Sequence, residues 1–545
     1  MLNEEKKQQR DMMIAMVLVI GVLMLFNRLT AKPEETVQVP LETPTVVETK
    51  AVETAPAVIE KTIPSEKQVV VSMKNNFVDG SFIANNTDFN NLSLTQYKET
   101  TEENSPAISL LNKDFQTTSV WTGNNLPDMA MEPTVQGDTL TPETPIVLTW
   151  ANETAVIERT VALDNGYMLT FTDKITNKTD TDLNLALTGK VIRAEDSIEV
   201  NRSSVHVGFL GLFDNQAEEE DYTSIKENEQ QTVQNKGGWI GITDKYWQAI
   251  FVPEQSVTSD MTFAKVGTNY VSSFKTPATV KANETITHTT KLFTGPKELS
   301  LIEEYEEQGI PRFDLSIDFG WYYFLTKPFL RLLGWLYGLI GNMGVVILIF
   351  ATLIRIALLP IATKSYKSMA KMKKIQPKVK ALQERFKDNR QQLQIEMMNL
   401  YKRDKVNPAS GCLPMLIQIP VFFALYKVLS VSILMRQAPF WGWIHDLSQP
   451  DPSSVFTAFG YLPWPIPSFL NIGIWPLIMG LTMVIQQKLN PSTAMTKDQK
   501  VMMNMMPIIF TFMMGNFAAG LVIYWTWSNI LSIAQQKYIM KKVGV

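Results

Sequence analysis

Six apolar stretches constrain this chain more than any other feature of its sequence. Each approaches or exceeds the roughly 20 residues that an α-helix needs to cross a lipid bilayer. They predict an α-helical membrane protein with six transmembrane helices. We interpret the first stretch as an uncleaved anchor, because the sequence "NRLTAKPEE" after it offers only a weak signal-peptidase site. The predicted spans are residues 12–27, 339–361, 412–435, 471–488, 502–517 and 519–537.

The charges between these stretches predict which side of the membrane each loop occupies. Residues 363–411 contain 13 Lys and Arg against four Asp and Glu, and such loops favour the cytoplasm. Residues 31–320 carry 22 basic and 44 acidic side chains, a net charge of −22, so the rest of the chain must carry +18 to give the total of −4. We expect this acidic segment outside and both termini inside. The predicted cytoplasmic segments are 1–11, 362–411, 489–501 and 538–545, and the loop 436–470 is expected outside.

The outer segment predicts a tether followed by a folded β-domain. Residues 28–65 are rich in Pro, Thr, Val and Glu and lack a helical period, which favours an extended linker. Residues 66–310 contain short alternating runs of β-forming residues, such as "YMLTFTDKITN", and predict a large antiparallel β-sandwich. Because the only cysteine, Cys412, lies elsewhere, this domain must fold without an internal disulfide. The aromatic residues of 311–338 then predict an amphipathic helix in the plane of the headgroups.

A basic helical hairpin is predicted in the cytoplasmic segment 362–411. Apolar residues recur there at spacings of three and four up to Phe386 and again from Leu393, with the polar turn "KDNR" between the two series. Two antiparallel helices would bury these seams against each other. The basic surface suits RNA or anionic lipid, or reflects only the preference of cations for cytoplasmic loops. The cations singled out are Lys371, Lys373, Lys374, Lys378, Lys380 and Arg385.

One arginine lies inside a predicted span. Arg355 interrupts the run "VVILIFATLIRIALLPIAT" (residues 345–363). A guanidinium near a bilayer centre costs roughly 2.5–3.5 kcal/mol on insertion scales, so it usually faces a wet cavity or a partner, or else snorkels to the membrane edge. None of the six stretches contains a carboxylate that would neutralise Arg355. A cavity around it would therefore be cationic.

Side chains on other spans predict the walls of that cavity. At about 100° per residue, Gln418, Phe422 and Leu425 share one face of their helix, whereas Lys427 lies on the opposite face. The fifth and sixth spans add hydroxyl and amide groups at helical spacing. The polar candidates are Arg355, Gln418, Thr511, Tyr524 and Ser528.

The sequence contains no recognisable catalytic or metal-binding motif. The patterns Gly-x-Ser-x-Gly, His-Glu-x-x-His and the phosphate-binding loop are all missing from it. His206 and His288 share no metal-ligand spacing and are interpreted as ordinary strand residues. We therefore predict a protein that is not an enzyme and needs neither a metal nor a cofactor.

Three segments resemble a known family. They are "QPKVKALQERFKDNRQQLQIEMMNLYKRDKVNPASGCLPMLIQIPVFFALY", "MRQAPFWGWIHDLSQPDP" and "FTFMMGNFAAGLVIYWTWSNILSIAQQ". Together they resemble the YidC/Oxa/Alb membrane protein insertases over about residues 320–540. The large β-domain resembles the form found in diderm bacteria. This resemblance implies a bacterial inner membrane with the β-domain in the periplasm.

The resemblance also implies a mechanism and partners. In the family, the arginine that matches Arg355 lies in a hydrophilic groove, open to the cytoplasm and to lipid, that attracts polar parts of a client and needs no ATP. Implied partners are nascent membrane proteins, the Sec translocon, the ribosome or signal recognition particle, and anionic lipids, and the resemblance is compatible with a monomer. Departures from the family pattern are "FAAGL", Lys427 and a short tail. The expected client-contacting positions, with Leu425 added from its helical face, are Ile419, Pro420, Phe422, Leu425, Ile508, Met513 and Trp525.

Two other functions stay open at this point. One is a transporter of small anions or lipid headgroups that uses Arg355 as its ligand. The other is a membrane-tethered carbohydrate-binding or carbohydrate-processing β-sandwich, although no convincing pair of carboxylates supports it. The sequence does not reveal the clients, the role of the β-domain, the oligomeric state or whether Arg355 is essential.

Overall fold

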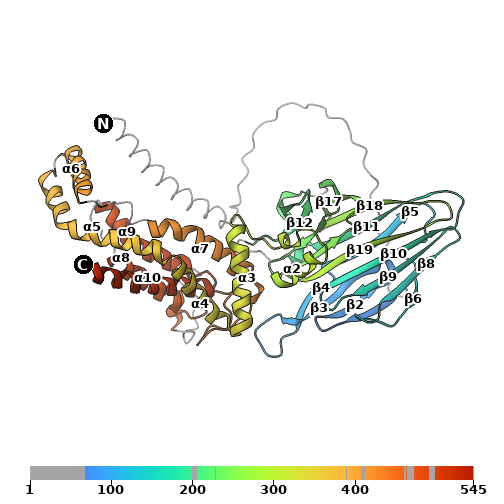
Figure 1. Ribbon diagram of the computed structural model, residues 1–545. Coiled ribbons are helices and arrows are strands. Elements are labelled where there is room, and N and C mark those ends of the chain that lie inside the picture. The colour runs from blue at the N-terminus through green and yellow to red at the C-terminus, as the bar shows by residue number, and fades with distance from the viewer. Residues whose placement is uncertain are drawn as a thin grey trace, which may run out of the picture.

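A β-domain and a set of helices make up the computed structural model (Figure 1). The described residues are 68–198, 205–226, 229–387, 389–404, 406, 413–458, 462, 472–489 and 497–543. The predicted first span, 12–27, and the predicted linker, 28–65, lie outside this part of the chain.

Two antiparallel sheets form the β-domain, as the alternating sequence predicted. Burial alternates along their strands, which places one face of each sheet against the shared core. The first sheet has the order β14 (Gln230–Lys236), β17 (Thr258–Val266), β18 (Asn269–Val280), β11 (Leu183–Ala194), β5 (Phe115–Gly123), β3 (Asp88–Lys98), β2 (Val78–Ile83), β1 (Val70–Lys74) and β7 (Thr139–Leu140), with β4 (Ala107–Leu111) paired to β3 and β7 parallel to β1. The second has the order β13 (Gln216–Asp221), β12 (Gly208–Phe213), β15 (Trp239–Thr243), β16 (Trp247–Val252), β19 (Thr285–Pro296), β10 (Met168–Asn177), β9 (Ala155–Leu163), β8 (Ile146–Ala151) and β6 (Thr134–Gln136).

A buried arginine–aspartate pair joins the two sheets. Arg159 on β9 donates from Nε to Asp173 Oδ1 at 2.6 Å and from Nη2 to Asp173 Oδ2 at 2.7 Å. Its Nη1 reaches Ser119 O on β5 at 2.5 Å and Thr87 Oγ1 at 2.9 Å. Trp121 Nε1, also on β5, donates to Asp173 Oδ2 at 2.7 Å. Both side chains are almost fully buried, at 0% and 1% exposed, so the pair is fully desolvated and hydrogen-bonded on all sides.

His288 on β19 is buried, and only one of its two ring nitrogens has a polar partner in the described part of the chain. Its Nδ1 lies 3.0 Å from Glu254 Oε2, and its Nε2 is buried without a hydrogen-bond partner in the described part of the chain. Burial lowers the pKa of the imidazole below its usual 6.5, and this outweighs the opposing effect of Glu254. Protonation would place a second N–H where the described residues offer no acceptor.

This depressed pKa predicts a pH dependence of β-domain stability. Below pH 6.5 the unfolded chain binds the proton more readily than the folded chain, so stability falls as the pH drops from 6.5 through the lower folded pKa. Thermal unfolding of the full-length protein between about pH 7.5 and 5.5 should show this loss. The His288→Gln variant should show a shallower pH dependence of unfolding. His445 is exposed, so the control variant His445→Gln should match the wild type. If the unfolding temperature of His288→Gln fell with pH as steeply as that of the wild type, His288 would not be the source of the pH dependence.

The helices follow the β-domain in the chain. They are α2 (Leu299–Glu307), α3 (Tyr323–Ile340), α4 (Met343–Ala357), α5 (Leu359–Arg385), α6 (Arg390–Arg403), α7 (Leu413–Val431), α8 (Ile474–Leu489), α9 (Lys497–Met514) and α10 (Ala519–Val543). Short 3-10 turns include η2 (Asn85–Thr87), η3 (Glu195–Ser197), η4 (Tyr222–Ser224), η5 (Phe313–Ser316), η7 (Ile433–Met435) and η8 (Val455–Thr457). Figure 1 shows α3 crossing the end of the other helices, between them and the β-domain.

The predicted span 339–361 is broken in the structure. Its first residues end α3, where Gly341 adopts the left-handed conformation (φ 72°), and Asn342 then caps α4 by accepting from Val345 N. A second break follows at Leu358, where α4 and α5 meet at a bend of 65°. Pro360 in the first turn of α5 lacks an N–H and so cannot continue the hydrogen bonding of α4. The mean apolarity of residues 339–361, on which the predicted span rested, did not reveal either break.

Taken singly, none of the described helices combines the length and the apolarity of a membrane crossing. The helices α4 and α5 meet that criterion only as a bent pair. Two shorter apolar helical stretches are Gln418–Val431 and Val501–Met514.

The segment predicted as an interfacial helix, 311–338, divides into two parts. Phe313 and Ile317 are buried in the core of the β-domain, and the Phe313 ring contacts Trp239 and Phe293. The β-domain therefore continues beyond residue 310, because these apolar side chains complete its core. The helix itself begins only at Tyr323 and runs to Ile340. Two aromatic residues of this segment, Trp321 just before the helix and Trp335 within it, are 96% and 62% exposed.

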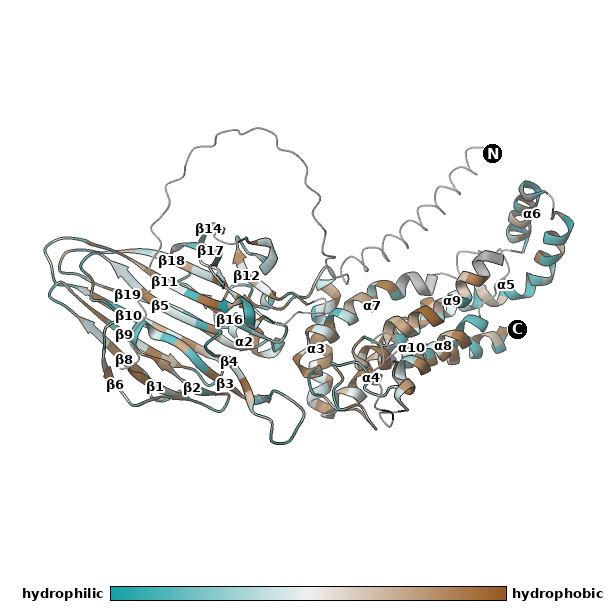
Figure 2. Ribbon diagram, turned by 180° about the vertical axis from the view of Figure 1, so that it is seen from behind, coloured by the Kyte–Doolittle hydropathy of each residue, from teal (hydrophilic) through white to brown (hydrophobic). Residues whose placement is uncertain are grey.

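The helices α5 and α6 fold against each other where a hairpin was predicted. Met372, Ile375 and Val379 on α5 pack with Leu400 on α6 and with Val406. Pro377 lies inside α5 and marks neither of its ends. The six cations singled out from the sequence are all exposed. Figure 2 shows the hairpin as largely hydrophilic and α4, α8 and α9 as largely hydrophobic.

Candidate functional site

Arg355 lies in the last turn of α4 and contacts α10. Its Nη2 donates to Ser528 Oγ at 2.6 Å and to Ser528 O at 3.0 Å. The C-terminal end of a helix carries a partial negative charge, which favours a cation in its last turn. Within the described ranges, Arg355 forms no ion pair with an acidic side chain. Among the described residues, its charge is therefore held by the neutral oxygens of Ser528.

Two further polar side chains complete a strip beside Arg355. Tyr524 lies one turn before Ser528 on α10, and its hydroxyl accepts from Gln418 Nε2 on α7 at 3.4 Å. Trp527 Nε1 donates to Thr352 Oγ1 on α4 at 3.0 Å, which fastens α10 to α4 one turn before Arg355. The structure thus brings together four of the five polar candidates from the sequence, and we call these four the polar strip. They are Arg355 on α4, Gln418 on α7, and Tyr524 and Ser528 on α10.

Thr511, the fifth polar candidate, lies in a different contact. It is 8% exposed, and its hydroxyl donates to Pro507 O of its own helix at 2.8 Å. A Cβ atom placed on Gly480 of α8 would lie 2.1 Å from Thr511 Oγ1, so α8 and α9 approach each other closely at this point. Asn504, seven residues before Thr511 on the same helix, accepts from Gln487 of α8 at 3.4 Å. This face of α9 therefore meets α8, and Thr511 is not brought to Arg355.

Apolar side chains border the polar strip on α7, α9 and α10. The Phe422 ring lies 4.6 Å from that of Trp525, which in turn lies 5.6 Å from the Phe510 ring. Ile508 is 49% exposed, and Ile419, Pro420 and Met513 are half-buried. Leu425, in contrast to the other expected client-contacting residues, is only 1% exposed and so is not accessible to a client. The others stay at least partly exposed, and Phe422 with Trp525 forms an apolar margin beside the polar strip.

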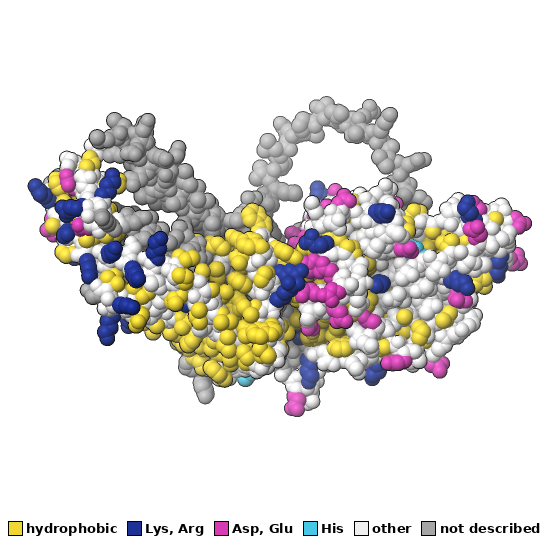
Figure 3. Space-filling model, viewed as in Figure 1, with side chains coloured by type: hydrophobic (Ala, Val, Ile, Leu, Met, Phe, Trp, Pro, Cys, Tyr) yellow, Lys and Arg dark blue, Asp and Glu magenta, His cyan; other side chains and the backbone are white. Residues whose placement is uncertain are grey.

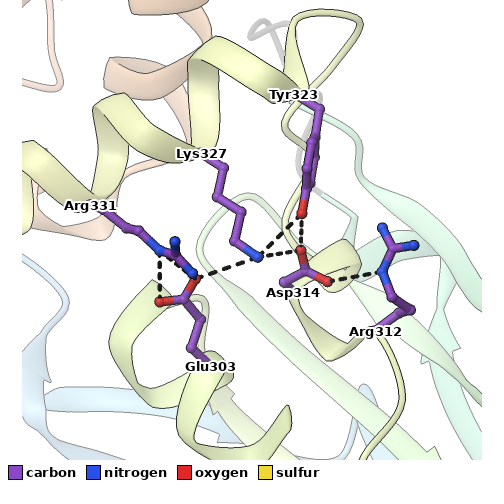
Figure 4. A network of polar contacts seen from close by, with 6 residues as sticks. All are labelled: Glu303, Arg312, Asp314, Tyr323, Lys327 and Arg331. Carbon is purple, nitrogen blue, oxygen red and sulfur yellow. Dashed lines mark hydrogen bonds and ion pairs between the residues drawn. The ribbon is translucent and has the colours of Figure 1, made fainter. Parts of the chain in front are cut away.

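A network of charges attaches α3 to the β-domain (Figure 4). Lys327 lies 2.6 Å from Asp314 Oδ2, and Arg331 Nη2 lies 2.5 Å from Glu303 Oε1 on α2. Burial raises the pKa of Asp314, but hydrogen bonds from Lys327 and Tyr323 outweigh it and leave that pKa below its usual value. These two cations, which interrupt the aromatic run in the sequence, thus pair with acids of the β-domain.

Comparisons with known proteins identify the family. The family model described as "60Kd inner membrane protein" matches residues 335–544, and the one described as "YidC periplasmic domain" matches residues 70–332. The membrane protein insertase YidC of Agrobacterium fabrum is 42% identical over 492 residues, which cover 87% of this chain and 82% of the relative. That of Beijerinckia indica is 44% identical over 491 residues, covering 86% and 81%. The chain belongs to the YidC family of membrane protein insertases.

Membership of the YidC family settles several expectations from the sequence. The family comprises inner-membrane insertases that carry a periplasmic domain, and it is not a family of enzymes. The β-domain, which lies within the matched residues 70–332, is thus the periplasmic domain, and the clients of this family are membrane proteins. A solved structure entitled "Active YidC insertase crystal structure with the first transmembrane domain resolved" covers 87% of this chain and 92% of its own at 17% identity, with a TM-score of 0.37.

Proposed function

We propose that the strip formed by Arg355, Gln418, Tyr524 and Ser528 is the hydrophilic groove through which this YidC-family protein inserts its clients. The observation that carries the proposal is the state of Arg355, which is half-buried between α4 and α10 and bonded only to neutral oxygens of Ser528 in the described structure. A cation held in this way attracts an acidic or polar client segment, because the two charges interact strongly where water is scarce.

The apolar margin gives the client a way out of the groove. Phe422 and Trp525 pack together at the edge of the polar strip, and exposed side chains of α9, including Ile508, continue the surface. A client helix that leaves its polar tail near Arg355 slides along this margin into lipid, driven by burial of its own apolar side chains. No nucleotide is required for such a transfer.

The proposed topology has six spans, with both termini and the α5–α6 hairpin in the cytoplasm. The exposed cations of the hairpin support this orientation, since basic loops favour the cytoplasm. Figure 3 shows these cations at the end of the helices remote from the β-domain, with a broad apolar surface between the two. In this orientation the hairpin meets a ribosome, a signal recognition particle or anionic lipid, and the protein works alone as a monomer or beside the Sec translocon.

Site-specific photo-crosslinking tests the groove. A photoreactive amino acid at Phe422, beside the strip, should crosslink to a short membrane client presented on stalled ribosomes. The same amino acid at Leu481, which is 60% exposed on α8, provides a matched apolar control and should give no crosslink. The absence of crosslinks from both positions in a folded protein would contradict the proposed groove. If small anions then stabilised the wild type but not Arg355→Ala, the transporter function would replace it.

A further inference from the structure

Lys427 on α7, the residue that departs from the family pattern, forms an ion pair with Asp318. The Lys427 ammonium contacts Asp318 Oδ2, and the two side chains are 15% and 10% exposed. The Lys427 stem lies along the backbone of Gly320, where a Cβ atom would come within 3.4 Å of Lys427 Cε. Asp318 is 109 residues away in the sequence, in the segment that leaves the β-domain. The pair therefore connects two parts of the chain that no local pattern links.

Asp318 is itself fixed to the β-domain. Its Oδ2 accepts from His206 N at 2.9 Å, in the segment that leads into β12, and its Oδ1 accepts from Gly320 N at 3.1 Å. The side chains on either side of it, Ile317 and Phe319, are buried at 1% and 3% exposure. The carboxylate cannot move without disturbing this core, so it provides a rigid anchor for Lys427.

A second attachment holds the same end of α7. Just beyond the helix, Arg436 Nη2 donates to Lys98 O at 2.6 Å, and Gln437 Nε2 donates to the same carbonyl at 2.9 Å. The Arg436 guanidinium also lies over the Trp247 ring of β16, 5.4 Å from its centroid. Because these contacts reach the Lys98 carbonyl at the end of β3 and the Trp247 ring of the second sheet, the segment that follows α7 is tied to both sheets of the β-domain.

The opposite face of α7 forms a wall of the proposed groove. Gln418 precedes Lys427 by nine residues, which in an α-helix is about half a turn out of phase and roughly 13 Å along the axis. Gln418 contacts Tyr524 and Phe422 contacts Trp525, both on α10. A rotation of α7 about its axis would therefore change the Lys427 contact and the groove contacts together.

We propose that Asp318 and Lys427 are positioning residues that let the periplasmic domain set the rotation of α7 and so hold Gln418 and Phe422 against the groove. This inference rests on the proposed function, and it assigns the periplasmic domain a role in shaping the client path. Neither residue touches the client. Their effect reaches it only through the orientation of α7.

The test uses the full-length protein in proteoliposomes and a single-span client. Lys427→Met and Asp318→Asn should each slow insertion about fivefold and reduce client crosslinking from Phe422 by a similar factor. The two changes together should cost little more than either alone, because both remove the same contact. Lys427→Arg, which keeps the cation opposite Asp318, should insert the client close to the wild-type rate. Lys427→Met should still unfold cooperatively, at a somewhat lower temperature than the wild type, because it leaves Asp318 without its cation.

A matched control is Lys537→Met, which removes an exposed lysine of α10 and should insert the client at the wild-type rate. Wild-type rates and crosslinks in Lys427→Met, or a loss in folded Lys427→Arg as large as that in Lys427→Met, would overturn the positioning role while leaving the proposed function intact. A wild-type protein that inserted no client would instead overturn the proposed function.

Discussion

Replacing Arg355 with alanine is expected to slow insertion of a client with an acidic outer tail at least tenfold. A tenfold loss corresponds to about 1.4 kcal/mol, which is modest for one charge interaction in a poorly hydrated site. Ser528 retains its place in α10 without the guanidinium, and among the described residues no acid is left unpaired by the change. The variant should therefore fold. Rates of client insertion into proteoliposomes, measured for wild type and variant under the same conditions, provide the readout.

The tail of the client supplies the control for this experiment. A client whose tail carries Asn and Gln in place of Asp and Glu should slow less than about threefold in Arg355→Ala, because it loses only hydrogen bonds. Arg355→Lys retains the charge but loses the geometry of the two contacts with Ser528, so it should fall between wild type and alanine. Equal slowing of both clients would show that Arg355 acts on the structure of the groove and not through its charge.

The polar strip around Arg355 was partly predictable because helical phase is a local property. Tyr524 and Ser528 are four residues apart, and Gln418 and Lys427 are nine apart, so their relative faces follow from the sequence alone. Phase does not tell which neighbouring helix a face meets. Thr511 was therefore assigned to the groove, whereas the structure packs it against Gly480 of α8.

The missed features depend on distant partners or on single residues within an apolar run. Asp318 and Lys427 lie 109 residues apart, and Arg159 reaches Ser119, which is 40 residues away. The bend at Leu358 was hidden because Pro360 barely changes the mean apolarity of its surroundings. The strands of the β-domain were easier to predict, since buried and exposed positions alternate within the sequence of each strand.

Arg159→Met is expected to destabilise the periplasmic domain by about 3–5 kcal/mol. The change leaves Asp173 charged and buried, and removing one member of a buried ion pair typically costs this much. Ser119 O and Thr87 Oγ1 also lose their donor, which adds to the effect. Pulse proteolysis of the full-length protein across a denaturant series, followed by the fragments of the β-domain, gives the free energy of unfolding.

The size of this effect distinguishes a buried pair from a surface pair. Lys74→Met removes the pair of Lys74 with Asp79, which lie 3.0 Å apart but are 67% and 52% exposed, and should cost less than about 0.5 kcal/mol. In the variant carrying both Arg159→Met and Asp173→Asn no charge is left unpaired, so part of the stability should return. Recovery should be incomplete, because the amide can accept from Trp121 but Ser119 O remains without its donor. If the double variant were no more stable than Arg159→Met, the cost would lie in lost packing between the two sheets and not in the unpaired charge.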